Sequence, residues 1–135
     1  MPALIHEISP PDVLVLGPEW PERALLRAEL IEEGYDVVAI DAWPIPQLYR
    51  RPRMTPRVAV VDLQGLPDPR MVLDELQSVM PRNRVLVITA LGTVRLDEIR
   101  HMGYEVVTRP TSVSDIVAAV AGLLQASELQ RVSPL

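Results

Sequence analysis

Three polar residues that could do chemistry each lie at the end of a short apolar run. Asp62 follows the run 58–61, Thr89 follows the run 85–88, and Arg109 lies just beyond the run 106–107. An aspartate can accept a phosphoryl group, but its attack on phosphorus needs a divalent ion to neutralise the carboxylate and the transferring oxygens. The same carboxylate can instead form a structural ion pair with an arginine. The residue types alone leave both interpretations open.

Five apolar runs alternate with helix-like segments along the chain. The runs cover residues 13–16, 37–40, 58–61, 85–88 and 106–107. Because they are rich in β-branched residues and lack polar alternation, they indicate strands that are covered on both faces, as in a parallel sheet. We therefore predict an α/β fold, a (βα)5 doubly wound parallel sheet with strand order 2-1-3-4-5. In such a sheet the ends of neighbouring strands meet at one edge.

The segments between the runs carry helix signals. Pro21 and Gly34 bound a helix whose buried face is expected to carry Ala24, Ala28 and Ile31. Further helices are expected to begin at about residues 68, 93 and 112, the last at a capping box.

Four short motifs in the second half of the chain narrow the interpretation. They are Val60-Val61-Asp62-Leu63, Val87-Ile88-Thr89-Ala90, Gly103, and Thr108-Arg109-Pro110. With them, the chain from about residue 12 to 125 resembles the receiver domain of bacterial response regulators, which has a flavodoxin/CheY-like fold. The resemblance places Asp62 at the family's phosphoacceptor position and Thr89 at its switch position. Arg109 stands where the family has a lysine.

The resemblance also implies a magnesium ion, held by an acidic pair after the first strand. This chain has Gly17-Pro18 there, and the nearest acids, Glu19 and Asp41, are weak candidate ligands. A shift along the loop moves a carboxylate by several ångströms, whereas metal coordination tolerates only a few tenths. Arg109 in turn replaces a compact ammonium with a broad guanidinium. We therefore expect a degenerate, pseudo-receiver-like member without a cofactor, with Mg²⁺ only if Glu19 or Asp41 replaces the usual acids.

Each of these residues also has a purely structural interpretation. Asp62 can pair with Arg109, which we favour over phosphoacceptance. Thr89 can bond a nearby backbone group, and Glu19 and Asp41 can be solvated loop carboxylates. We accordingly assign no catalytic residue.

A second feature is the proline-rich crossover 42–56, which is expected to hold at most a turn or two around 47–51 because proline interrupts helices. Its candidate interaction residues are Trp43, Tyr49, Arg50, Arg51 and Arg53. Aromatic and arginine side chains are common anchors of protein interfaces. In the alternative interpretation, Trp43 covers the sheet and the arginines are solvated.

Composition excludes several function classes. The chain has 135 residues, 48% of them hydrophobic, and a formal net charge of −5, which gives no electrostatic reason to bind nucleic acid. Without cysteine it can have neither disulfides nor thiolate chemistry, and His6 and His101 lie too far apart in sequence to suggest a metal pair. No signal peptide is recognisable and no apolar run approaches the roughly 20 residues that span a bilayer. We expect a cytoplasmic protein.

These observations predict a single receiver-like domain over residues 1–135, with a core at about 12–126 and short terminal arms. We expect a stand-alone, non-enzymatic signalling protein that mainly binds other proteins and is phosphorylated poorly. Its partners would be proteins, including a homodimer through residues 96–102, the fifth strand and the helix from residue 112, with neither nucleic acid nor membrane. The alternatives are a working receiver phosphorylated on Asp62 in a phosphorelay, and a small-ligand-binding or enzymatic protein that shares only the fold.

Overall fold

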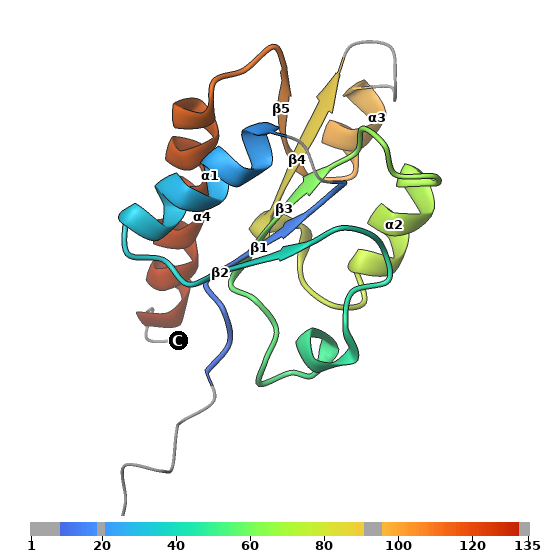
Figure 1. The fold of residues 1–135 in the computed structure, drawn as a ribbon. Coiled ribbons are helices and arrows are strands. Elements are labelled where there is room, and N and C mark those ends of the chain that lie inside the picture. Colours follow the sequence, from blue (N-terminus) through green and yellow to red (C-terminus); the bar gives the residue numbers. More distant parts are fainter. Residues whose placement is uncertain (1–8, 19–20, 91–95, 133–135) are drawn as a thin grey trace, which may run out of the picture.

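A five-stranded parallel sheet forms the centre of the molecule (Figure 1). The structure is a computed structural model that describes residues 9–18, 21–90 and 96–132. The strands are β1 (Val13–Leu16), β2 (Val37–Ile40), β3 (Val58–Asp62), β4 (Val85–Ala90) and β5 (Glu105–Arg109). They are hydrogen-bonded in the order β2-β1-β3-β4-β5, and every neighbouring pair is parallel. This confirms the predicted fold class and strand order.

Helices cover both faces of this sheet. They are α1 (Pro21–Glu32), α2 (Pro69–Leu76), α3 (Leu96–His101) and α4 (Val113–Val132), with short 3₁₀ turns η2 (Gln47–Arg50) and η3 (Arg82–Arg84). The helices α1 and α4 pack on one face, and α2 and α3 lie on the other (Figure 1). The single turn η2 is what the prolines of the crossover predict. Among the described residues, no helix combines the length and the apolar character needed to cross a membrane.

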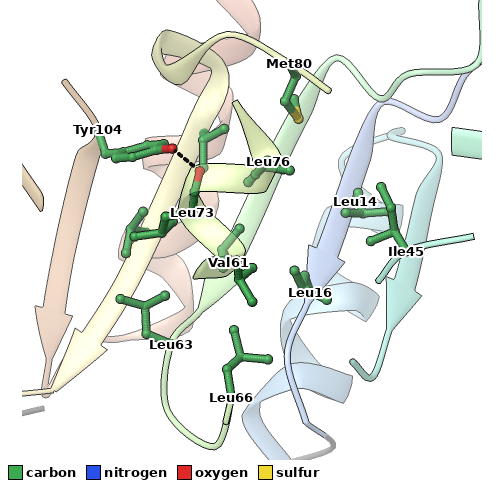
Figure 2. Close-up of a cluster of buried hydrophobic side chains, with 14 of the residues drawn as sticks. Leu14, Leu16, Ile45, Val61, Leu63, Leu66, Leu73, Leu76, Met80 and Tyr104 are labelled. Carbon is green, nitrogen blue, oxygen red and sulfur yellow. Dashed lines mark hydrogen bonds between the residues drawn. The ribbon is translucent and has the colours of Figure 1, made fainter. Parts of the chain in front are cut away.

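The apolar strand residues divide between two buried clusters, because successive side chains of a strand point to opposite faces. Figure 2 shows the cluster on the α2 side, where Leu14 and Leu16 of β1 pack near Leu76. The hydroxyl of Tyr104 donates a 2.9 Å hydrogen bond to the carbonyl of Leu73 within this cluster (Figure 2). The segment before β5 is thereby fixed to α2.

The prediction of which face of α1 is buried is wrong. Leu26 and Leu30 are fully buried, whereas Ala24, Ala28 and Ile31 are exposed. The helix carries apolar residues on two faces, and burial of the larger leucines removes more apolar surface from water than burial of alanines would. An apolar stripe on α1 therefore faces solvent.

The C-terminal arm expected from residue 127 also differs from the structure, because α4 continues to Val132. Ser127 is buried, and Glu128 forms an ion pair with Arg57. Arg57 also lies 3.3 Å from a carboxylate oxygen of Asp12, just before β1. The last turns of α4 are thus part of the packed domain.

Candidate functional site

The three predicted site residues lie at the carboxyl ends of neighbouring strands of the sheet, where β3, β4 and β5 end. Asp62 closes β3, Thr89 lies in β4 opposite Thr108, and Arg109 closes β5. The side chains of Asp62 and Thr89 are almost fully buried. Strand order and register alone therefore bring these residues of distant sequence together.

Asp62 and Arg109 form a bidentate ion pair. Arg109 Nη1 lies 2.8 Å from Asp62 Oδ1, and Arg109 Nη2 lies 2.7 Å from Asp62 Oδ2. The backbone amide of Gln64 donates a further 3.0 Å hydrogen bond to Asp62 Oδ1, and the Gln64 side-chain oxygen lies 3.3 Å from Arg109 Nη1. Paired N–H donors of this kind match a carboxylate in both charge and shape. Both oxygens of Asp62 are therefore engaged within the chain.

The electrostatics of the pair hold Arg109 in its charged form. The hydrogen bonds that Arg109 donates to Asp62 raise the pKa of Arg109 above its usual value, desolvation opposes this, and Glu22 at 3.7 Å adds a smaller attraction. Because the Asp62 side chain is only 2% exposed, removing the arginine would leave a buried charge uncompensated.

Gly17 and Pro18 fill the place where the family resemblance calls for an acidic pair. A Cβ atom added to Gly17 would lie 2.9 Å from Asp62 Cβ, and one added to Gly65 would lie 2.5 Å from Pro18 Cγ. Contacts this short require the neighbouring atoms to move. The turn after β1 thus packs directly on Asp62 and on the loop that follows it, and an acidic side chain at position 17 does not fit this arrangement.

The weak metal-ligand candidates do not complete a site. Asp41 is 74% exposed, and its Oδ1 lies 2.6 Å from Arg23 Nη1, which also donates to the carbonyl of Gly17 at 2.7 Å. Glu19 lies outside the described residues. Within the parts of the chain that the structure describes, no three histidine, cysteine, aspartate or glutamate side chains are grouped so as to hold a metal ion. Magnesium prefers several oxygen ligands. The described residues therefore do not form a site for the magnesium ion that the family resemblance implies.

Sequence reasoning missed two participants, Arg23 and Gln64. Arg23 links the ends of β1 and β2, while Gln64 contacts both members of the Asp62–Arg109 pair. The spacing of Gln64, two residues after Asp62, is compatible with an Asx-type turn and could have identified its amide as a donor. No comparable pattern marks Arg23, because its contact depends on how α1 packs on the sheet.

The aromatic residues of the crossover pack against their own chain. Trp43 and Tyr49 contact the buried cluster on the α2 side, and the Trp43 Nε1 donates a 3.2 Å hydrogen bond to Glu75 Oε1. The Arg50 guanidinium lies 5.8 Å from the centre of the Trp43 ring. Two further residues, Arg51 and Arg53, are exposed. This placement agrees with the interpretation in which the aromatics cover the sheet, and the interface role of the arginines stays a prediction.

No family model and no curated protein sequence matches this chain. Among solved structures, the chain is similar to the signal receiver domain of a Luxo repressor protein from Vibrio parahaemolyticus. The two share 23% identity and a TM-score of 0.72, over 91% of this chain and 96% of that one. The chain has a receiver fold.

Two further solved structures support this conclusion about the fold. NtrX from Brucella abortus, solved with ATP, is 23% identical with a TM-score of 0.72, over 90% of this chain and 28% of the NtrX chain. The beryllofluoride-activated NtrC4 receiver domain dimer is 24% identical with a TM-score of 0.69, over 85% of this chain and 97% of that one. The chain thus spans little more than a quarter of NtrX and nearly all of the separate receiver domains. At these identities the likeness shows the fold alone, and function must be argued from the site.

Proposed function

We propose that this protein is a receiver-like signalling module that acts mainly by binding other proteins, without catalysis and without efficient phosphorylation. The bidentate pair between Asp62 and Arg109 is the observation that carries the proposal. It converts the residue at the phosphoacceptor position into a structural link between β3 and β5.

Phosphoacceptance would require this pair to open. One oxygen of Asp62 would have to leave Arg109 to reach phosphorus, and breaking a buried ion pair is unfavourable by about 3–5 kcal/mol. Since each 1.4 kcal/mol is a factor of ten, an opening of ~3 kcal/mol alone would reduce the reactive population about a hundredfold. Gly17 and Pro18 supply no side-chain oxygen to seat a compensating cation.

The partners we propose are proteins of a bacterial signalling pathway in the cytoplasm, including a second copy of this chain. The proposed face comprises α3, β5 and α4. β5 is an edge strand, its first residue Glu105 is exposed, and its other residues are only partly buried. The NtrC4 receiver domain, which shares the fold, is a dimer. We propose no nucleic-acid or membrane partner, and no cofactor.

Phosphorylation by small donors tests the proposal. The protein would be incubated with acetyl phosphate or phosphoramidate and Mg²⁺, and its intact mass measured, beside a receiver domain that accepts phosphate from the same donors. We expect no stoichiometric phosphorylation of this chain under conditions that phosphorylate the control. Stoichiometric, magnesium-dependent acylphosphate that disappears in Asp62→Ala would overturn the proposal.

The alternative of a working phosphoacceptor makes a separate prediction about the metal. If Glu19 or Asp41 replaced the usual acids, Mg²⁺ would bind, and Asp62→Asn and Glu19→Gln would both weaken it. Isothermal titration of Mg²⁺ into the wild type and these two variants distinguishes a working phosphoacceptor from the non-catalytic module. The Arg23–Asp41 ion pair gives Asp41 a different role and favours the non-catalytic interpretation.

A small-ligand enzyme that shares only the fold has less support. The described cavities lie between α1 and β2, between α1 and α4, and beside α3, and none of these is lined by Asp62, Thr89 or Arg109. A metabolite bound at the strand ends would favour that alternative.

A further inference from the structure

Within the part of the chain that the structure describes, strand β2 forms an unpaired edge of the sheet. It lies at one end of the strand order (Figure 1), and its sequence Val-Val-Ala-Ile contains neither a charge nor a proline. Natural proteins commonly protect an edge with charged residues, proline or a bulge, because unpaired backbone groups can recruit another strand. Apart from its shortness, β2 shows none of these devices.

The register identifies which backbone groups of β2 point outward. The carbonyl of Asp36 accepts a hydrogen bond from the amide of Val13, and the carbonyl of Ile40 accepts one from the amide of Gly17. In a parallel ladder the N–H and C=O of one residue face the same neighbour and alternate along the strand. The amides and carbonyls of Val37 and Ala39 therefore face away from β1, where no other strand of the described chain pairs with them.

A cavity of about 550 Å³ lies beside this edge. The described residues that line it belong to α1 and β2, and they are Arg23, Ala24, Arg27, Val37, Val38 and Ala39. The exposed stripe of α1, with Ala28 and Ile31, continues beyond the lining residue Ala24. The small side chains leave room for an added strand to place its own side chains against α1.

The charge of this cavity indicates what an added strand would carry. Arg23 is already engaged by Asp41 and the carbonyl of Gly17. Arg27 is exposed, and among the described residues it takes part in no ion pair. A carboxylate on the incoming segment would complement the guanidinium of Arg27. This positive charge lies on a chain that is acidic overall.

We propose that β2 binds an extended acidic peptide segment of a partner protein, which adds to the sheet as a sixth strand. Main-chain hydrogen bonds from Val37 and Ala39 supply affinity, and Arg27 selects an acidic side chain. This site is separate from Asp62 and does not depend on whether that residue is phosphorylated.

Charge also decides between this partner and a second copy of the chain. An antiparallel pairing of two β2 strands about a two-fold axis normal to the sheet would bring both α1 helices to the same face. Arg23 and Arg27 of one copy would then approach those of the other, and like charges oppose such an interface. A peptide that carries carboxylates has no such conflict.

A selection from a displayed library of random seven-residue peptides tests the proposal. Wild type, Ala39→Pro and Ala39→Ser would be compared as targets. Ala39→Pro removes one outward amide without touching the ladder to β1, and Ala39→Ser is the matched control that keeps the amide. We expect wild type and Ala39→Ser to enrich the same acidic, β-branched peptides, and Ala39→Pro to enrich none of them.

The strongest selected peptide would then be synthesised and measured by fluorescence anisotropy. We expect at least tenfold weaker binding to Ala39→Pro and to Arg27→Glu, and less than threefold weaker binding to Arg27→Lys. Amide exchange should slow at Val37 and Ala39 when this peptide binds. If the circular dichroism of Ala39→Pro shows that this variant does not fold like wild type, its binding result is set aside. The Arg27 variants and the exchange of the Val37 and Ala39 amides then test whether the peptide binds at β2.

Three outcomes would overturn the proposal. They are the absence of enrichment on wild type over Ala39→Pro, enriched peptides that bind Ala39→Pro or Arg27→Glu as tightly as wild type, and a dimer in light scattering that Ala39→Pro dissociates. The last result would assign the edge to a second copy instead. None of them bears on the phosphorylation test at Asp62.

Discussion

Asp62 and Arg109 show how one carboxylate can change its role when its neighbours change. A buried aspartate needs compensation, which a divalent ion would provide in an active receiver and which the guanidinium of Arg109 provides here. Because the arginine satisfies both oxygens, the site can be stable without any ligand. The pair is then a structural element, and its removal should lower the free energy of unfolding.

Removal of Arg109 should destabilise the fold. We expect Arg109→Ala to lower the free energy of unfolding by about 3–5 kcal/mol, because the buried carboxylate loses its partner. Arg100→Ala, at an exposed position of α3, should change it by less than about 0.5 kcal/mol. Urea denaturation of both variants measures the difference. Adding Asp62→Asn to Arg109→Ala should recover part of the loss, and equal effects of the two arginine variants would contradict the structural role.

Gly17 offers a second test at the same scale. We expect Gly17→Ala to destabilise the protein by about 1–3 kcal/mol, since its Cβ would lie 2.9 Å from Asp62 Cβ. Gly122→Ala is the matched control, because its Cβ meets no atom within 4 Å and alanine favours the helix by about 0.5–1 kcal/mol. Thermal unfolding should therefore shift in opposite directions for the two variants. A neutral Gly17→Ala would show that the turn after β1 is free to move.

The sequence predicted the Asp62–Arg109 pair because both residues end strands that must meet at one edge of the sheet. It could not predict the packing of Gly17 on Asp62, since a glycine after a strand is equally compatible with an open turn. The contact of Arg23 with Asp41 was likewise beyond prediction, because it depends on the orientation of α1 and on one rotamer.

Among the elements, α1 and α4 differ most from expectation. Both faces of α1 carry apolar residues, so periodicity alone could not decide between Leu26 and Ala28, and side-chain volume decided in favour of leucine. The end of α4 was misplaced because no proline or terminal glycine marks it before residue 133. In the structure, Arg57 contacts the Leu124 carbonyl and Glu128, so that the last turns pack against the sheet.

The contact between α2 and the segment before β5 predicts a pH dependence. Burial raises the pKa of Tyr104 above its usual value, so the folded state keeps this proton when the unfolded chain has begun to lose it. Tyr104 therefore contributes stability that is fully present below a pH of about 10, the usual tyrosine pKa, and is lost as the pH rises through the higher folded pKa. We expect the free energy of unfolding to fall more steeply above that pH in wild type than in Tyr104→Phe.

Urea denaturation between about pH 8 and 11.5 measures this difference. The sequence contains no lysine, so few other side chains titrate in the same window. Tyr49→Phe is the control, because it removes a tyrosine hydroxyl on η2 and leaves the hydrogen bond from Tyr104 to Leu73 in place. Parallel slopes for wild type and Tyr104→Phe would contradict the buried hydroxyl.

For the whole molecule, the sequence was sufficient to predict the fold. Five continuous β-branched runs separated by helix signals admit few arrangements other than a doubly wound parallel sheet. The sequence could not predict whether the two edge strands, β2 and β5, are covered by other parts of the chain. Whether β2 is covered depends on how far the crossover 42–56 extends, and a segment with four prolines carries little periodic signal to predict that.

Magnesium should leave the stability of the whole protein unchanged. A ligand that binds only the folded state at a hundred times its Kd stabilises it by about 2.7 kcal/mol, which a thermal melt detects readily. We expect the melting temperature in millimolar Mg²⁺ to equal that in EDTA at matched ionic strength. A rise that depends on Mg²⁺ concentration and disappears in Asp62→Asn would indicate a site that the described residues do not form.

The contacts of Arg57 have a practical consequence for experiments. This side chain joins Asp12, just before the first strand, to Glu128, near the end of the last helix, so both ends of the described domain converge on one pole. Asp62 lies at the opposite pole, because the strands are parallel and it closes β3. A fluorophore, biotin or surface tether attached at this first pole would accordingly leave the Asp62 pole turned toward solution.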